Sequence, residues 1–218
     1  GKVLDTAVVF PTPEFKKVEQ AKTVVKGLIR RHGVQILAIG NGTAGRETEL
    51  FAAEVIRELG PERAQAAHQV FMREMVLPHI QPQALALVRH HQAAGDAVLI
   101  VTATNEFVTR PIADAFGVAE LIAIRLERDA AGNPTGEIAG TPSFREGKVA
   151  RVAEWLAQRG LGWADVSHST FYSDSINDLA MLEHVHEPVA ANPDERLLAI
   201  ARQRQWRILN LFHDQETH

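Results

Sequence analysis

Three short segments in the second half of this 218-residue sequence place residues that could do chemistry directly after apolar runs. They are LIVTATN at 99–105, GTPSFREGK at 140–148 and FYSDSIND at 171–178. Together they offer hydroxyl groups, an ammonium group and two carboxylates. In open α/β sheets the carboxyl ends of the strands meet along one edge, and ligands bind there. These residue types therefore favour a site for a phosphate group and a hard cation such as Mg²⁺.

In this hypothesis Thr102 donates a hydrogen bond to a phosphoryl oxygen, Lys148 neutralises its charge and Asp174 holds the cation. Taken singly, a threonine after a strand or an Asp-Ser pair before a helix is usually a helix cap. The order and spacing of the three segments together favour a site. The predicted catalytic, phosphate-binding and metal-binding residues are Thr102, Ala103, Thr104, Lys148, Asp174 and Asp178.

The elements that must position these residues alternate between strands and helices. Helical periodicity covers 61–94, with an interruption at Pro78. Strands are predicted at 98–102, 170–173, 188–191 and 207–211, helices at 106–116, 147–159, 176–184 and 194–203, and a hairpin between 120–128 and 137–139. This alternation predicts an α/β fold with a mostly parallel sheet flanked by helices.

The first sixty residues show a similar alternation. We expect strands at 3–10 and 35–39 and helices at 16–32 and 46–59. The run GNGTAG at 40–45 matches G-x-G-x-x-G, but no second strand with a terminal acid follows it. We therefore interpret these glycines as a tight turn and Glu47, in the next helical turn, as a helix-capping residue.

Composition limits the classes of function. The formal net charge is −4 and the pI is about 6.2, which argues against a surface that coats nucleic acid. There is no cysteine, so a thiol nucleophile is excluded and a reducing cytoplasm is the expected location. No apolar run reaches the length of a membrane span. Nothing in the sequence predicts an oligomeric state.

Residues 66–214 resemble the haloacid dehalogenase (HAD) superfamily, in particular its phosphoserine-phosphatase-like branch. Thr102 matches the second motif of that superfamily, Lys148 the third, and Asp174 with Asp178 the acidic fourth. The resemblance implies a HAD-like (Rossmannoid) core and a Mg²⁺ cofactor. It also implies hydrolysis of a small phosphorylated metabolite such as phosphoserine or histidinol phosphate.

The first motif of that superfamily, Asp-x-Asp-x-Thr after an apolar strand, is absent from the sequence. Its first Asp would attack phosphorus, and its second would act as general acid and base. Asp5 precedes the apolar run and Glu14 follows two prolines, so neither matches the motif. We therefore expect a scaffold that binds phosphate and, weakly, Mg²⁺, with catalysis impaired.

Residues 1–56, and above all IGNGTAGRETE at 39–49, resemble the YqgF-type, RNase H-like domain of the transcription accessory protein Tex. This predicts a composite chain, with an incomplete Tex-like segment at 1–60 and a HAD-like segment at 61–218. The strand at 3–10 could then take the place of the missing HAD lead strand and give one continuous sheet.

Two other classes of function stay open. Lysines and arginines on the helix at 16–32 could mark a module associated with nucleic acid, although a solvated helix face explains them more simply. A recombined or engineered chimera would have no evolved function.

Overall fold

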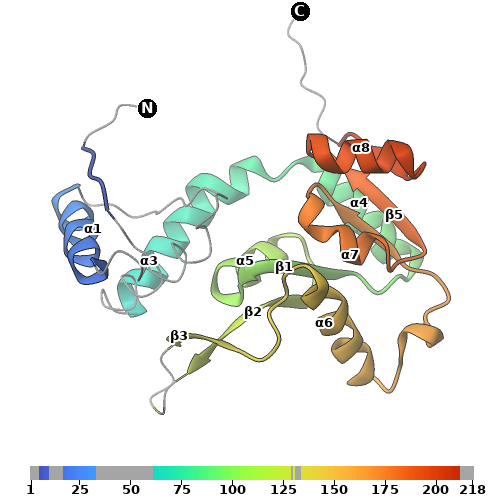
Figure 1. Ribbon diagram of the computed structural model, residues 1–218, viewed down its shortest axis with the longest axis horizontal. Coiled ribbons are helices and arrows are strands. Elements are labelled where there is room, and N and C mark those ends of the chain that lie inside the picture. The colour runs from blue at the N-terminus through green and yellow to red at the C-terminus, as the bar shows by residue number, and fades with distance from the viewer. Residues whose placement is uncertain (1–4, 10–16, 33–60, 129, 131–133, 212–218) are drawn as a thin grey trace, which may run out of the picture. The chain divides into compact units, whose positions relative to one another are not determined.

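The structure is a computed structural model that describes residues 5–9, 17–32, 61–128, 130 and 134–211 (Figure 1). It divides into two compact units. The first contains Gly1–His79 and Glu127–Glu137, and the second Ile80–Leu126 and Ile138–His218. All six predicted site residues belong to the second unit. These units are compact parts of the structure, and the family boundary expected between residues 60 and 61 stays a prediction.

The described part of the first unit is mainly helical. Its elements are α1 (Val18–His32), α3 (Pro61–Phe71), a π-helical segment (Met72–Val76) and a 3₁₀ turn (Leu77–His79). The π-helical segment and the 3₁₀ turn interrupt the helical pattern that the sequence predicts across 61–94. In the described part of the chain, no helix has the length and apolar character needed to cross a membrane.

Residues 5–9 form no strand, so the prediction of a strand at 3–10 is wrong for its described part. Asp5 binds Arg31 of α1, with 3.0 Å between Oδ2 and Nη1. Val9 packs with Ala21 of α1 in a small apolar cluster, while Val8 is 84% exposed. The segment is therefore held by side-chain contacts with a helix. The expected strand at 35–39, the helix at 46–59, the glycine turn at 40–45, Glu14 and Glu47 lie outside the described residues.

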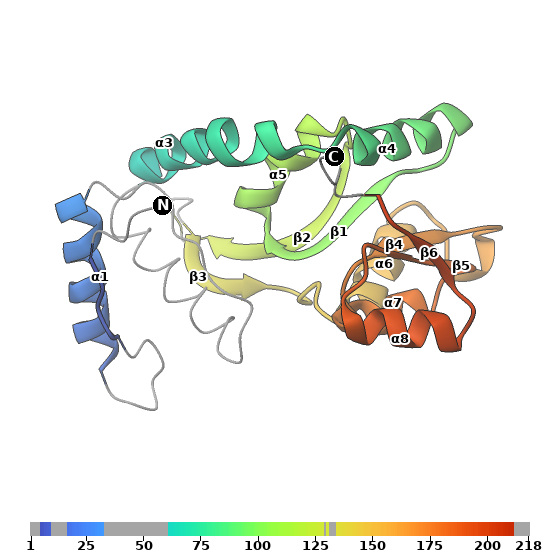
Figure 2. The ribbon, with the colours of Figure 1, turned by 90° about the horizontal axis from the view of Figure 1, so that it is seen from above.

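The second unit carries the α/β pattern (Figures 1 and 2). Its elements are α4 (Pro82–Ala94), β1 (Leu99–Asn105), α5 (Glu106–Ala115), β2 (Glu120–Arg128), β3 (Pro134–Ala139), α6 (Glu146–Ala157), β4 (Thr170–Ser173), α7 (Leu179–Leu182), β5 (Glu187–Ala191), α8 (Glu195–Gln203) and β6 (Arg207–Leu209). The last residues of β2 and the first of β3 are assigned to the first unit. The sequence places most of these elements within a few residues of their observed bounds.

Polar caps explain several of these bounds. The side chain of Asn105 accepts a hydrogen bond from Val108 N at 3.0 Å, so β1 runs directly into α5. Asp194 caps α8 in the same way, through Leu197 N at 2.7 Å. At the other end of a helix, Gly95 stops α4 with φ of +83°, a conformation that glycine adopts without strain.

The described strands form two three-stranded sheets, in the orders β1-β2-β3 and β4-β5-β6. β1 and β2 are parallel, as are β4, β5 and β6. The possibility of one continuous sheet is therefore not borne out among the described residues. The physical reason is that 5–9, the described part of the expected joining strand, pairs with no strand and packs on α1 instead.

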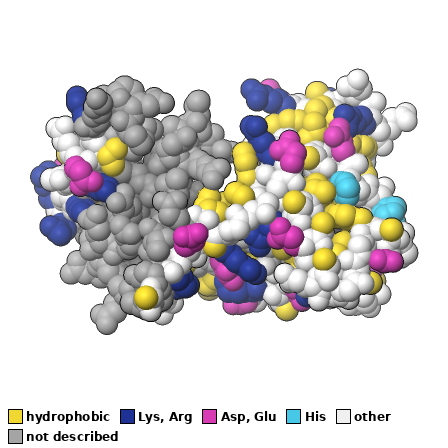
Figure 3. Space-filling view, turned by 60° about the horizontal axis from the view of Figure 1, so that its bottom comes forward, with side chains coloured by type: hydrophobic (Ala, Val, Ile, Leu, Met, Phe, Trp, Pro, Cys, Tyr) yellow, Lys and Arg dark blue, Asp and Glu magenta, His cyan; other side chains and the backbone are white. Residues whose placement is uncertain are grey.

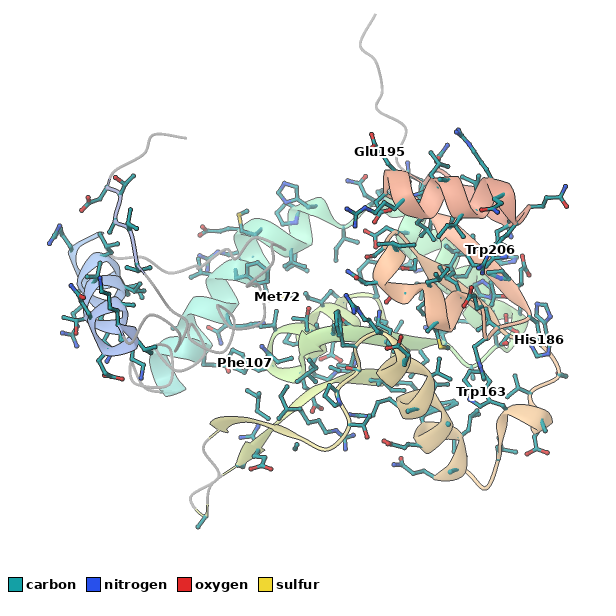
Figure 4. All side chains as sticks on the ribbon, viewed as in Figure 1. Met72, Phe107, Trp163, His186, Glu195 and Trp206 are labelled. Carbon is teal, nitrogen blue, oxygen red and sulfur yellow. The ribbon has the colours of Figure 1, made fainter. Side chains whose placement is uncertain are left out.

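Two apolar clusters hold the second unit together. In the first, Val152 and Leu156 of α6 pack with Ile122 of β2 and Met181 of α7. In the second, side chains of α7, β5 and α8 pack with Trp206, whose ring lies near α8 (Figure 4). Figure 2 shows the strands of this unit in one layer, with α4 on one side and α7 and α8 on the other. This layer positions the carboxyl ends of β1 and β4, where Thr102 and Asp174 lie.

Glu120 ties β2 to α6. Its carboxylate accepts hydrogen bonds from Trp155 Nε1 at 2.8 Å and from Arg159 Nη2 at 2.7 Å. The hydrogen bond from Trp155 lowers the pKa of Glu120 below its ordinary value; burial opposes this effect and Arg159 adds to it. A carboxyl group with a lowered folded pKa stabilises the fold above its unfolded pKa and loses this contribution as pH falls through the folded value.

We therefore expect Glu120→Gln to lower the free energy of unfolding at neutral pH, and the difference from the wild type to fade below about pH 4. Urea unfolding across this pH range is the measurement. Glu195→Gln, an exposed change in the first turn of α8 (Figure 4), is the matched control. A stability difference that stayed constant with pH would contradict the lowered pKa of Glu120.

Candidate functional site

The ladder between β1 and β2 breaks at Thr102–Thr104. Val101 pairs with Ile122 and Asn105 with Ile124, so four steps along β1 match two steps along β2. Thr102 Oγ1 accepts a hydrogen bond from Thr104 N at 3.1 Å, which closes a local turn. The three positions predicted to bind phosphate therefore form a bulge at the end of β1, outside the regular strand pairing.

The loop before α6 is anchored to this bulge. Ser143 is fully buried, and its hydroxyl donates a hydrogen bond to the carbonyl oxygen of Thr102 at 2.6 Å. Arg145, just before α6, has φ of +49°, a value uncommon for a residue with a side chain. The hydrogen bond joins segments 41 residues apart in the chain. It brings two of the three predicted segments together.

The ion pair of Lys148 with Asp178 connects the second predicted segment, 140–148, to the third, 171–178. The Lys148 ammonium lies 2.6 Å from Asp178 Oδ1, and both side chains are largely buried. Ser173 Oγ, at the end of β4, donates to the other carboxylate oxygen at 2.8 Å. The ammonium also lies 5.8 Å from the centre of the Phe171 ring. A buried cation with a fixed partner is thus connected, through Asp178 and Ser173, to the carboxyl end of β4.

Asp174 differs from Asp178 in its surroundings. Its side chain is exposed and makes no hydrogen bond or ion pair with any residue in the described part of the chain. Its backbone is fixed instead, since its carbonyl oxygen accepts from Asp194 N at 2.8 Å. The side chain of Asp194 in turn accepts from Ile176 N at 3.3 Å. The backbone at Asp174 is therefore held in place, and its carboxylate is exposed to solvent.

Mg²⁺ prefers six oxygen ligands in near-octahedral geometry. No group of three or more histidine or acidic side chains suited to a metal ion occurs among the described residues. Asp178 is already engaged by Lys148 and Ser173, which leaves Asp174 as the candidate ligand. The described residues therefore do not by themselves complete a magnesium site.

Two supporting residues escaped the sequence analysis. The sequence predicts Ser173 only as the end of a strand, yet its side chain binds Asp178. It predicts Asp194 only as the start of a helix, yet Asp194 holds the backbone at Asp174 and Ile176. Its sequence signal was the run NPDE at 192–195, in which an acid precedes a helix and acts as an N-cap. The long-range bonds of both residues leave no local signal.

Gly147 allows the close approach on which the α6 loop depends. A Cβ atom at this position would lie 2.0 Å from the carbonyl oxygen of Pro142, which is backbone and cannot swing away. We expect Gly147→Ala to displace the loop that carries Ser143 and Lys148. The free energy of unfolding should fall by about 1–3 kcal/mol, the usual effect of overpacking.

Chemical denaturation is the measurement for this change. Gly162→Ala is the control, because its Cβ would meet only the Asp165 carboxylate, at an ordinary 3.7 Å. Equal stabilities for the two variants would show that the loop has room to move.

Several known proteins are similar to this chain. It is 45% identical over 143 residues to the histidinol-phosphatase of Neisseria meningitidis, covering 66% of this chain and 64% of that protein. A crystal structure of a protein of unknown function from Bordetella pertussis matches with a TM-score of 0.74 and 44% identity, over 93% of this chain and 87% of that one. A probable phosphoserine phosphatase from Vibrio cholerae matches with a TM-score of 0.54 at 14% identity, over 86% and 52%. The last likeness shows the fold alone.

The chain spans between 47 and 64% of the length of the first curated relatives that it matches. One further relative is similar over a much shorter stretch of this chain. Over 59 residues, 27% of its length, this chain is 42% identical to the uncharacterized protein YdcI of Bacillus subtilis, and it covers 8% of that protein. None of these names describes an RNase H-like domain, so the Tex-like segment and the composite origin stay predictions.

The sequence model of the haloacid dehalogenase-like hydrolases matches residues 18–183, which is more than half of the 218 residues. The match contains all six predicted site residues. It begins 48 positions before residue 66, within the segment that the sequence analysis assigned to another family. The chain belongs to the haloacid dehalogenase-like hydrolase family.

Proposed function

We propose that this chain carries the phosphate-binding part of a phosphomonoester hydrolase site and lacks the attacking carboxylate. One observation carries the proposal. The ammonium of Lys148, fixed by Asp178 at 2.6 Å, lies at the carboxyl end of β4, and the loop before it is bonded to the Thr102 bulge at the end of β1. A hydroxyl and a buried cation are thereby connected through one anchored loop. This combination suits a phosphoryl group.

Each residue has a physical role in the proposal. The Thr102 hydroxyl donates to a phosphoryl oxygen, and Lys148 balances part of the phosphate charge. Asp178 keeps the ammonium in place and partly neutralises it. Asp174 attracts a hard cation, which when bound would screen the remaining negative charge of the phosphate. Mg²⁺ is the proposed cation, and the described ligands make its binding weak.

The proposed substrate class is a phosphomonoester of a small metabolite. The relative named histidinol-phosphatase supports this class. An impaired reaction follows from the missing acid, because Asp-x-Asp-x-Thr occurs nowhere in the 218 residues. Asp5 does not match the motif, and its side chain is paired with Arg31 of α1.

A nucleic-acid function has less support. Lys22 of α1 pairs with Glu19 at 2.8 Å, so one of the basic side chains on that helix is already balanced. In Figure 3 the second unit shows acidic and basic side chains interspersed over the visible face. A binding surface for nucleic acid would instead show a continuous basic stripe.

Binding measurements test the proposal. We expect inorganic phosphate to bind in the presence of Mg²⁺, and Mg²⁺ alone to bind only in the millimolar range or more weakly, about −4 kcal/mol at best. Isothermal titration calorimetry is the measurement. Thr102→Val should weaken phosphate binding, whereas Thr102→Ser, which keeps the hydroxyl, should retain it.

A separate pair of variants tests Asp174 as the ligand of Mg²⁺. Asp174→Asn should abolish the residual Mg²⁺ binding, and Asp165→Asn, an exposed change in another loop, should leave it unchanged. Micromolar Mg²⁺ affinity that disappears in Asp174→Asn would contradict the weak site. Phosphate affinity unchanged in Thr102→Val would contradict the role of Thr102.

A further inference from the structure

The loop between β3 and α6 makes a tight turn at Arg145. Arg145 has φ of +49° and ψ of −122°, and Gly147 N donates a hydrogen bond to the carbonyl oxygen of Phe144 at 2.9 Å. These angles and this hydrogen bond match a type II′ turn with Arg145 at its first central position. Glycine is the residue that this position favours. An arginine there strains the backbone, because its Cβ atom is crowded at positive φ.

The side chain of Arg145 contributes little to packing. It is exposed, and it makes no hydrogen bond or ion pair with any residue in the described part of the chain. The centre of its guanidinium group lies 5.1 Å from the centre of the Phe144 ring. Phe144 is itself 39% exposed, so this contact buries little apolar surface. Strained backbone of this kind clusters at active sites and ligand clamps.

The residues on either side of Arg145 connect it to the proposed phosphate site. Two positions earlier, the buried hydroxyl of Ser143 donates to the carbonyl oxygen of Thr102 at 2.6 Å. Three positions later, Lys148 N donates to the carbonyl oxygen of Arg145 at 3.0 Å, and the Lys148 ammonium is paired with Asp178. Arg145 therefore lies on the anchored loop between the two groups that are proposed to bind phosphate.

Without Arg145, the proposed phosphate site has no positive charge to spare. The charged groups of Lys148 and Asp178 lie 2.6 Å apart and balance each other, and Thr102 contributes a neutral hydroxyl. The exposed carboxylate of Asp174 adds a negative charge. These surroundings disfavour a phosphate anion. Arg145 is the other cation of the same loop, and no described carboxylate pairs with it.

We propose that Arg145 is a further phosphate-binding residue, whose guanidinium binds oxygens of the phosphoryl group. This inference rests on the proposed function and adds a residue to that site. A guanidinium presents its N–H groups in a planar fork that matches the oxygens of a phosphoryl group. The Phe144 ring contacts the guanidinium without using its N–H donors, which stay available to the ligand.

Titration calorimetry of the whole chain with inorganic phosphate, in the presence of Mg²⁺, tests the inference. We expect Arg145→Gln to raise the Kd for phosphate about tenfold, the effect of losing a charge-assisted hydrogen bond. Arg145→Lys keeps the charge but loses the planar fork, so its Kd should lie between those of the wild type and Arg145→Gln. Arg202→Gln is the control and should leave the Kd unchanged, because Arg202 is an exposed arginine of α8 without an ion pair among the described residues.

Substitution by glycine separates phosphate binding from a structural role. Arg145→Gly relieves the strain of the turn, so we expect its urea unfolding midpoint to rise while its Kd for phosphate also rises about tenfold. Gln205→Gly is the control, because Gln205 also has a positive φ, of +57°. Its unfolding midpoint should rise as well, but its Kd for phosphate should not change.

A Kd unchanged in Arg145→Gln would overturn the inference, and weaker phosphate binding by Thr102→Val would then leave the proposed function standing. Weaker binding by Arg145→Gly together with a lower unfolding midpoint would overturn the inference in favour of a structural role. A tenfold effect of Arg145→Gln on phosphonoacetate but none on inorganic phosphate would overturn it in favour of a second anionic group on the ligand. A wild-type chain that binds no phosphate would overturn both this inference and the proposed function.

Discussion

Replacing Lys148 by Met should lower the free energy of unfolding by about 3–5 kcal/mol, because it leaves the carboxylate of Asp178 buried without its cation. The side chains of the pair are 7% and 13% exposed, and their charged atoms lie 2.6 Å apart. Ser173 would keep one hydrogen bond to Asp178, but a hydroxyl cannot balance a full charge. The double variant Lys148→Met/Asp178→Asn should recover much of the loss.

Urea unfolding of the single and double variants measures this effect. The control is Arg204→Met, which breaks an ion pair with Glu183 whose side chains are 40% and 42% exposed. Surface pairs of this kind contribute about 1 kcal/mol or less. If Lys148→Met were no more costly than Arg204→Met, water would have to reach the Lys148–Asp178 pair.

The strand ends of the second unit are largely predictable because local patterns determine them. An apolar run followed by a capping side chain, as at Asn105 or Asp194, marks where one element stops and the next begins. The convergence of the three segments was also predictable, since the carboxyl ends of parallel strands share one edge. The hydrogen bond from Ser143 to Thr102 and the ion pair of Lys148 with Asp178 agree with that expectation.

The remaining features depend on contacts that a local pattern does not encode. Strand periodicity at 3–10 was misleading, because Val9 buries itself against α1 and no partner strand pairs with 5–9. The end of β1 was placed at Thr102, but pairing resumes at Asn105 after the bulge. The different surroundings of Asp174 and Asp178 arise from a lysine 26 and 30 positions before them in the chain.

The largest expected effect concerns turnover. We expect the 218-residue chain to hydrolyse a generic aryl phosphate at or near the uncatalysed rate, because the loss of a nucleophile commonly removes several powers of ten, roughly 10⁴ to 10⁶, from an enzyme's rate. In the proposed site Thr102 and Lys148 hold and neutralise a phosphoryl group, but neither residue offers a carboxylate to attack it. Pro11 and Pro13, which follow the apolar run at the place where the motif would have its acids, provide no backbone N–H groups to bind phosphate.

A steady-state assay with Mg²⁺ measures this rate, and beryllium fluoride tests for a trapped analogue of an aspartyl phosphate. We expect neither turnover nor trapping, and no difference between the wild type and Asp174→Asn. Robust Mg²⁺-dependent hydrolysis that disappears in Asp174→Asn would show that another residue makes the attack. Glu14→Gln would then be the first variant to assay, with Glu195→Gln as its control, because Glu14 is the acid nearest after the apolar run that ends at Phe10.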